Sequence, residues 1–271
     1  MIWLKFLFFK FLALSINPSY GFISLNCNDT ISVGLTIQQT CQDDDTLIIT
    51  SAGSVILTGS DAIDADSKSG VTIDNKGTIS ASTNQAINMQ HAINTTVTNS
   101  GTIEASLRNA ILMDGNDADS NTINNSGTLK AGKKQVILAT NSENTTIINS
   151  GSIETTDSSN PNTNGINYYN TSGSAINGAT ITNSGTIFAY GHAIRFGTSG
   201  NASKAVNNMT ITNTGTIEGG TASIAVNNVN ATGTNIITQD LSLIHISEPT
   251  RRRGISFAVV GVEKKGGGGG G

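Results

Sequence analysis

The chain has 271 residues, of which 13% are charged and 5% aromatic, with 30 Gly, 3 Pro and a formal net charge of −4 at pH 7. A soluble protein ordinarily has about 25% charged residues, so most of the polar surface here must come from Ser, Thr and Asn. The acidic balance argues against nucleic-acid binding. The composition alone would also suit a disordered chain, but the regular placement of Ile described below argues against disorder.

Residues 1–22 have the layout of a secretory signal peptide. Lys5 and Lys10 lie among bulky apolar residues, and small and polar residues follow from Ser15 to Gly21. Lys10 interrupts the apolar run, so the run is shorter than the about 20 residues that a membrane-spanning helix needs. We therefore expect export, with cleavage between Ser19 and Ser24.

Residues 23–46 are expected to form an N-terminal cap that contains the 2 cysteines of the chain, Cys27 and Cys41. A close cysteine pair in an exported chain usually forms a disulfide, and closing a loop of about 15 residues could add about 3 kcal/mol. Two cysteines with no histidine nearby do not make a zinc site. We expect no metal and no cofactor.

Residues 47–240 are organised by a short repeat that begins as DNKGTI at 74–79 and ends as TNTGTI at 212–217. Counted from a weaker copy at Gly53, the successive glycines are 24, 24, 26, 24, 34 and 30 residues apart. A period in this range indicates a repeat architecture. The glycines of the full copies are Gly77, Gly101, Gly127, Gly151, Gly185 and Gly215.

Each copy has an alternating apolar pattern on both sides of its glycine. Ile73 lies four residues before Gly77, and Ile79 and Ala81 lie two and four residues after it; most other copies match this pattern. Period-two alternation around a glycine predicts strand, turn and strand. A further short strand is expected about ten residues later, as at Ile87. Such strands bury their Ile residues only when coils stack, so we predict an all-β fold, a parallel β-helix (β-solenoid) of about seven coils with 24–34 residues per coil.

The repeat glycine and the asparagine two residues before it explain the corner of each coil. We expect the glycine to adopt a left-handed backbone that a β-branched residue would resist. The asparagines should stack at one corner and form a hydrogen-bonded ladder along the axis. The predicted ladder residues are Asn75, Asn99, Asn125, Asn149, Asn183 and Asn213.

This repeat, with runs such as TITNSGTI, resembles the passenger regions of autotransporters and related type V secreted proteins, over about residues 45–235. The resemblance implies a secreted protein at the bacterial cell surface, with a role in structural display or adhesion. It also implies an outer-membrane β-barrel after the passenger, which would be the chain's only link to the membrane and which this sequence lacks.

The tail from Leu241 to Gly271 departs from every trend in the chain. Its segment LSLIHISEPTR resembles the translation of a transposase-type sequencing adapter, and ISFAV at 255–259 nearly matches the next adapter stretch at the expected spacing. We therefore interpret 241–271 as an artefact that truncates the gene, and expect it to be disordered. The tail holds five basic and two acidic residues, so 10 basic and 17 acidic residues remain, a net charge near −7.

The sequence predicts no catalytic site. The acids at Asp61, Asp64 and Asp66, and at Asp114, Asp117 and Asp119, lie in polar stretches between strands, where solvated loops are the simpler interpretation. His91 and His192 lie in different coils, and neither has a partner that suggests a nucleophile and its base. The main alternative is a secreted β-helix enzyme acting on polysaccharides, which would gather carboxylates in a groove.

The candidate ligand-binding residues are Tyr169, Phe188 and Tyr190, which alternation places outward on two adjacent coils. These coils carry insertions around 170–179 and 198–206, and solenoids often bind ligands at such insertions. The partner is expected to be an unknown surface ligand, either a glycan or a host or cell protein.

Ice binding is a weaker alternative, suggested by a column of threonines one residue after each repeat glycine. Ser152 breaks that column, and threonine is in any case a good strand former. The column comprises Thr78, Thr102, Thr128, Thr186 and Thr216.

Overall fold

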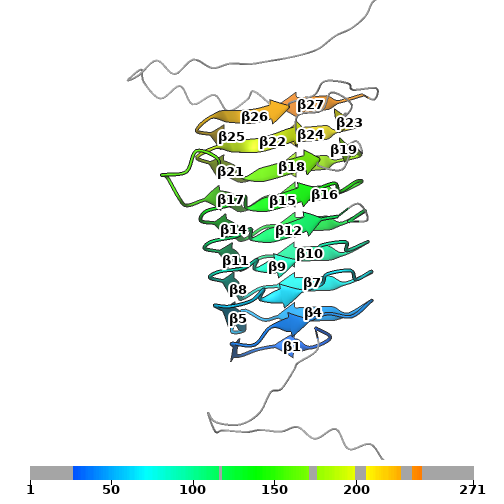
Figure 1. Ribbon diagram of the computed structural model, residues 1–271, viewed down its shortest axis with the longest axis vertical. Coiled ribbons are helices and arrows are strands. Elements are labelled where there is room, and N and C mark those ends of the chain that lie inside the picture. The colour runs from blue at the N-terminus through cyan, green and yellow to red at the C-terminus, as the bar shows by residue number, and fades with distance from the viewer. Residues whose placement is uncertain (1–26, 116–117, 171–175, 199–205, 227–233, 240–271) are drawn as a thin grey trace, which may run out of the picture.

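The structure, a computed structural model, describes residues 27–115, 118–170, 176–198, 206–226 and 234–239. The chain winds into a solenoid whose strands stack in order along one axis, from β1 at one end to β27 at the other (Figure 1). The predicted signal peptide and the tail from Leu241 lie outside the described residues. Within the described part, no helix is long and apolar enough to span a membrane.

Three long sheets run the length of the solenoid, and every strand pair in them is parallel. The first sheet contains β1 (Thr30–Ile31), β4 (Thr46–Ile49), β7 (Thr72–Asn75), β10 (Thr96–Asn99), β13 (Thr122–Asn125), β16 (Thr146–Asn149), β20 (Thr180–Asn183), β24 (Thr210–Asn213) and β27 (Ile236–Gln239). The second contains β2 (Gly34–Leu35), β5 (Ser54–Leu57), β8 (Thr78–Ala81), β11 (Thr102–Ala105), β14 (Thr128–Ala131), β17 (Ser152–Thr155), β21 (Thr186–Ala189) and β25 (Thr216–Gly219). The third contains β3 (Gln39–Thr40), β6 (Ile63–Asp64), β9 (Ile87–Asn88), β12 (Ile111–Asp114), β15 (Ile137–Thr140), β18 (Ile166–Asn170), β22 (His192–Thr198) and β26 (Ala222–Val226).

Each coil contributes one strand to each sheet, which confirms the predicted parallel β-solenoid of about seven coils. In each coil the repeat phrase spans the end of the first-sheet strand, the corner and the start of the second-sheet strand, as in β7 and β8 around Gly77. A coil with shorter strands, β1 to β3, pairs in register with β4 to β6 at the N-terminal end. Residues of the two insertions form a small extra pair, β19 (Ile176–Asn177) and β23 (Val206–Asn207).

The core is a set of apolar columns that run through the centre of the coils. Ile73, Ile79 and Ile87 come from the three sheets of one coil, and all are fully buried. Each pairs with the matching position of the next coil, for example Ile79 with Ile103. Burying one such side chain stabilises the fold by about 1.5–3 kcal/mol, and an isolated coil could not provide that burial.

Two large aromatic residues fill the core of the third sheet where its strands lengthen. Tyr168 of β18 and Phe196 of β22 are in register and stack with ring centroids 4.8 Å apart. The buried hydroxyl of Tyr168 lies 2.6 Å from Oγ1 of Thr145, which gives it a hydrogen-bond partner. Burial raises the pKa of the Tyr168 phenol, so it stays protonated.

The reason predicted for the repeat glycine is wrong. Positive φ angles in the described glycines occur at Gly70, Gly115 and Gly178, not at the repeat glycines. The repeat glycine is needed instead because stacked coils approach closely: a Cβ on Gly101 would lie 2.1 Å from the carbonyl oxygen of Gly77.

Most left-handed residues occur at a different corner, just before the strands of the first sheet. Their amides donate to a carbonyl of the following coil, as Asn94 N does to Asp119 O at 3.0 Å. Asn, Asp, Ser and Gly tolerate this conformation better than β-branched residues. The residues at this corner are Asp44, Gly70, Asn94, Ser120, Asn144, Gly178 and Asn208.

Candidate binding faces

The six asparagines predicted to stack form a continuous buried ladder. In each rung, Nδ2 donates to Oδ1 of the asparagine in the next coil, at 2.7 or 2.8 Å. The same Nδ2 also reaches carbonyl oxygens; that of Asn99 lies 3.2 Å from the oxygens of Gly101 and Thr128. Each amide therefore ties two coils together, and the ladder is structural rather than a ligand site.

Cys27 and Cys41 are joined by a disulfide and are fully buried. Both belong to the apolar core at the N-terminal end of the solenoid. Cys41 N also donates to Asp64 O of the next coil at 2.8 Å. The disulfide therefore closes the shortest coil, and the backbone hydrogen bond of Cys41 links that coil to the next one.

The three aromatic candidates do not form one group. Phe188 of β21 and Tyr190 at the following corner make an edge-to-face contact, with ring centroids 5.1 Å apart. Tyr169 belongs to the third sheet, in β18, where it is half-buried. The structure therefore places Phe188 and Tyr190 on one face of the solenoid and Tyr169 on another.

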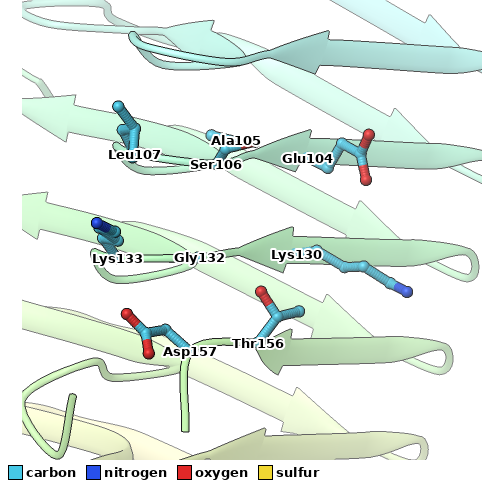
Figure 2. A pocket seen from close by; sticks show the side chains of 9 residues that line it. All are labelled: Glu104, Ala105, Ser106, Leu107, Lys130, Gly132, Lys133, Thr156 and Asp157. Atoms are coloured by element: carbon cyan, nitrogen blue, oxygen red, sulfur yellow. The ribbon is translucent and has the colours of Figure 1, made fainter. Parts of the chain in front are cut away.

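A shallow groove of about 360 Å³ lies beside the second sheet and its outer corner (Figure 2). Across it run Glu104 and Lys130, which occupy matching positions of β11 and β14. Lys130 Nζ lies 2.9 Å from Glu154 Oε1, and this hydrogen bond and charge raise the pKa of Lys130. The groove is lined by Glu104, Ala105, Ser106, Leu107, Lys130, Gly132, Lys133, Thr156 and Asp157.

The aromatic pair continues this face in the next coil. Phe188 is in register with Glu154, and Tyr190 N donates to Thr155 Oγ1 at 3.0 Å. The outward column of the second sheet therefore carries Glu104, Lys130 and Glu154, then Phe188, and then Glu218 in the following coil. This combination suits a polar ligand that also has an apolar face.

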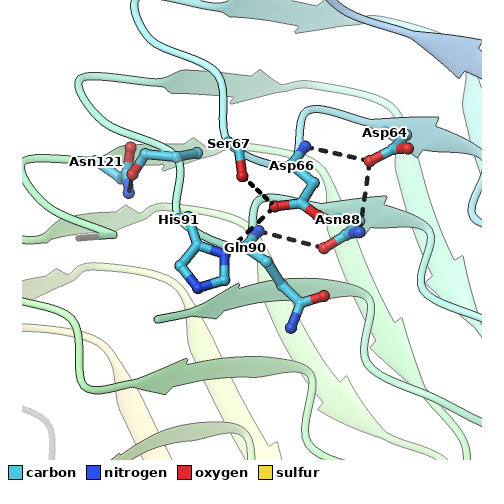
Figure 3. A network of polar contacts seen from close by, with 8 residues as sticks. Asp64, Asp66, Ser67, Asn88, Gln90, His91 and Asn121 are labelled. Carbon is cyan, nitrogen blue, oxygen red and sulfur yellow. Dashed lines mark hydrogen bonds and ion pairs between the residues drawn. The ribbon is translucent and has the colours of Figure 1, made fainter. Parts of the chain in front are cut away.

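The third sheet has an acidic and amide-rich end, shown in Figure 3. Asp66 Oδ1 accepts from Ser67 Oγ at 2.9 Å and lies 3.4 Å from His91 Nδ1. Asn88 Nδ2 donates to Asp64 Oδ1 at 3.4 Å. No partner for His91 could be predicted from the sequence, and in the structure Asp66 of the preceding coil lies beside it.

This network does not have the connections of a catalytic triad. A nucleophilic serine would hydrogen-bond to the imidazole, which in turn bonds to the carboxylate. Here Ser67 and His91 both contact the same oxygen of Asp66. In the described part of the chain, no group of three or more His, Cys, Asp or Glu side chains is placed to hold a metal.

The remaining acids mostly hold backbone amides. Asp61 Oδ1 accepts from Gln85 N at 3.0 Å, and Asp119 Oδ1 accepts from Glu143 N at 2.9 Å. Burial raises the pKa values of Asp61 and Asp114. Asp117 lies outside the described residues.

The other end of the third sheet carries polar side chains that the sequence analysis did not assign to a binding site. Asn167 of β18 and Arg195 of β22 are in register, and His192 lies at the start of β22. The only sequence signal was an arginine within an otherwise apolar strand, in the run HAIRF.

In comparisons with known proteins, no family model, curated protein or solved structure matches this chain.

Proposed function

We propose that this chain is part of an exported solenoid of the autotransporter passenger type, which displays its outer faces at a bacterial surface and acts in adhesion. The observation that carries the proposal is the unbroken register of the coils, which turns the outer surface into long columns of Thr, Ser and Asn. A rod of this kind holds side chains far from its attachment point without a catalytic centre. The asparagine ladder and the disulfide support the same role, since both stiffen the rod.

Two experiments test this proposal. Sequencing the native gene past codon 240 should reveal further coils and then a translocator domain; if it encodes Arg251 to Arg253 and the glycine run, the adapter interpretation is wrong. Antibodies against the purified chain should label intact source cells, and the soluble chain should compete with their adhesion. Labelling only after permeabilisation would overturn surface display.

Ice binding is a second candidate, favoured by a threonine column that the sequence analysis did not identify. The first residue of successive strands in the first sheet is threonine in seven consecutive coils, without the interruption that Ser152 makes in the second sheet. Thermal hysteresis in a solution of the purified chain would support this function, and its absence would exclude it. The column comprises Thr46, Thr72, Thr96, Thr122, Thr146, Thr180 and Thr210.

A further inference from the structure

The outer face of the third sheet carries a partly buried guanidinium that no described carboxylate neutralises. Ion pairs in the described part of the chain involve Lys76, His91 and Lys130, and none involves Arg195. The buried Nε of Arg195 has no hydrogen-bond partner. A desolvated charge without a partner is costly, so Arg195 is poised to receive an anion.

The backbone beside Arg195 provides the space that its guanidinium occupies. A Cβ on Gly197 would lie 3.1 Å from Nε and 3.3 Å from Cζ of Arg195. The guanidinium therefore lies over Gly197, which is in register with Tyr169 of the preceding coil. This places the cation next to the strand position of a half-buried aromatic ring.

Two further polar atoms near Arg195 also lack partners. Asn167 is in register with Arg195 and is 4% exposed, and its Oδ1 accepts no hydrogen bond. Nδ1 of His192 is likewise buried and unpartnered. Native structures rarely leave buried polar atoms unsatisfied, so the two such atoms on this face, Arg195 Nε and Asn167 Oδ1, which belong to residues in register on adjacent strands, indicate that something else completes the face.

Arg195 is the one full positive charge of this group at neutral pH. Burial, and then the charge of Arg195, lower the pKa of His192 below its ordinary value of 6.5, so its imidazole is neutral at pH 7. An unpartnered amide oxygen calls for a donor such as a hydroxyl. The ring of Tyr169, two residues after Asn167 on the same side of β18, offers an apolar surface with a polar edge.

We propose that Arg195, Asn167 and Tyr169 form a binding site for a carboxylate-bearing pyranose, that is, a uronic acid unit of an acidic polysaccharide. The guanidinium fork binds the carboxylate, Asn167 Oδ1 accepts from a sugar hydroxyl, and the C–H face of the sugar packs on Tyr169. Inorganic phosphate would satisfy Arg195 alone, because it has no apolar face. This inference rests on the proposed adhesive function, because it names the class of ligand to which the solenoid would adhere.

Binding of oligogalacturonate and oligoglucuronate to the purified full chain, measured by calorimetry, tests this site. The Arg195→Gln variant should bind at least about tenfold more weakly, because a hydrogen bond to a charged group is lost. Arg195→Lys should be intermediate, since it keeps the charge without the fork, and Tyr169→Ala should also weaken binding. Arg108→Gln is the matched control, because Arg108 interacts with Asp61 at the other end of the sheet, and it should bind like the parent chain.

The outcomes separate the site from the function. The inference would be overturned if neither uronate bound, or if a neutral oligogalactose or phosphate bound as tightly as the uronates. It would also be overturned if the Arg195→Lys or Tyr169→Ala variant bound uronates as tightly as the parent chain. If these results occur while the soluble chain still blocks adhesion, the proposed function stands without this ligand. If uronates bind at Arg195 but antibodies do not label intact cells, surface display fails and the site stands.

Discussion

Removing one central rung of the asparagine ladder should destabilise the solenoid by about 2–4 kcal/mol. In the parent chain, Asn125 Nδ2 donates to Asn149 Oδ1 at 2.7 Å and to Ser152 O at 3.1 Å, and Asn125 Oδ1 accepts from Asn99 at 2.8 Å. Each buried hydrogen bond contributes about 1 kcal/mol net, and a buried acceptor left without a partner costs about 1–3 kcal/mol. Asn125→Ala removes both ladder bonds and leaves Asn149 Oδ1 without a donor.

The assay is urea unfolding followed by far-UV circular dichroism, with the midpoints compared at equal m-values. Asn124→Ala is the matched control, because Asn124 is the neighbouring residue on the outward side of the same strand and lies outside the ladder. Surface substitutions of this kind usually change stability by less than about 0.5 kcal/mol. A value for Asn125→Ala within about 0.5 kcal/mol of that for Asn124→Ala would refute the structural role given to the ladder.

Two further predictions concern the corner glycines and a buried acid. Gly127→Ala should destabilise the fold by about 1–3 kcal/mol or more, because its Cβ would lie 2.2 Å from Gly101 O. Gly59→Ala is the control and should be nearly neutral, because nothing lies within 4 Å of its Cβ. Thermal unfolding compares the two variants, and equal melting temperatures would contradict the close-approach explanation. Burial raises the pKa of Asp61 above 3.8, so the folded state holds this proton more tightly and stability falls as pH rises from 3.8 through the raised value. Asp61→Asn should remove that slope and raise stability at pH 7, because asparagine keeps an Oδ1 acceptor for Gln85 N without the cost of a partly buried charge. Unfolding midpoints measured across pH check this, and an unchanged slope or a lower midpoint at pH 7 would contradict it.

Local pattern was sufficient to predict the stacking of the coils. Ile73 and Ile79 recur at fixed offsets from the repeat glycine, and a residue that recurs at the coil period falls into one column when coils stack. For the same reason, the ladder of asparagines two residues before each glycine could be predicted from the sequence alone. Alternation likewise placed Tyr169 on the outward side, and in the structure it is half-buried while its neighbour Tyr168 is fully buried.

The pattern did not reveal why the repeat glycine is required. From sequence, a glycine at a turn suggests a left-handed backbone, but Gly101 is constrained by Gly77 O of the preceding coil. That contact depends on the distance between coils rather than on the conformation of one residue. Glycine marks only two of the seven left-handed positions before the first-sheet strands, Gly70 and Gly178, and the others are Asn, Asp or Ser.

The sequence by itself determined the fold class, the coil period and the inward and outward sides of each strand, because these follow from short-range alternation and a repeated offset. Only the tertiary structure decided which outward side chains become neighbours. The insertions lengthen two coils to 34 and 30 residues, so a fixed period no longer aligns sequence positions there. The register that pairs Asn167 with Arg195 comes instead from backbone hydrogen bonding between coils. Charge pairing is decided in the same way: among the described residues, the positions in register with Arg195 are Asn167 in β18 and Ala225 in β26, and neither is a carboxylate.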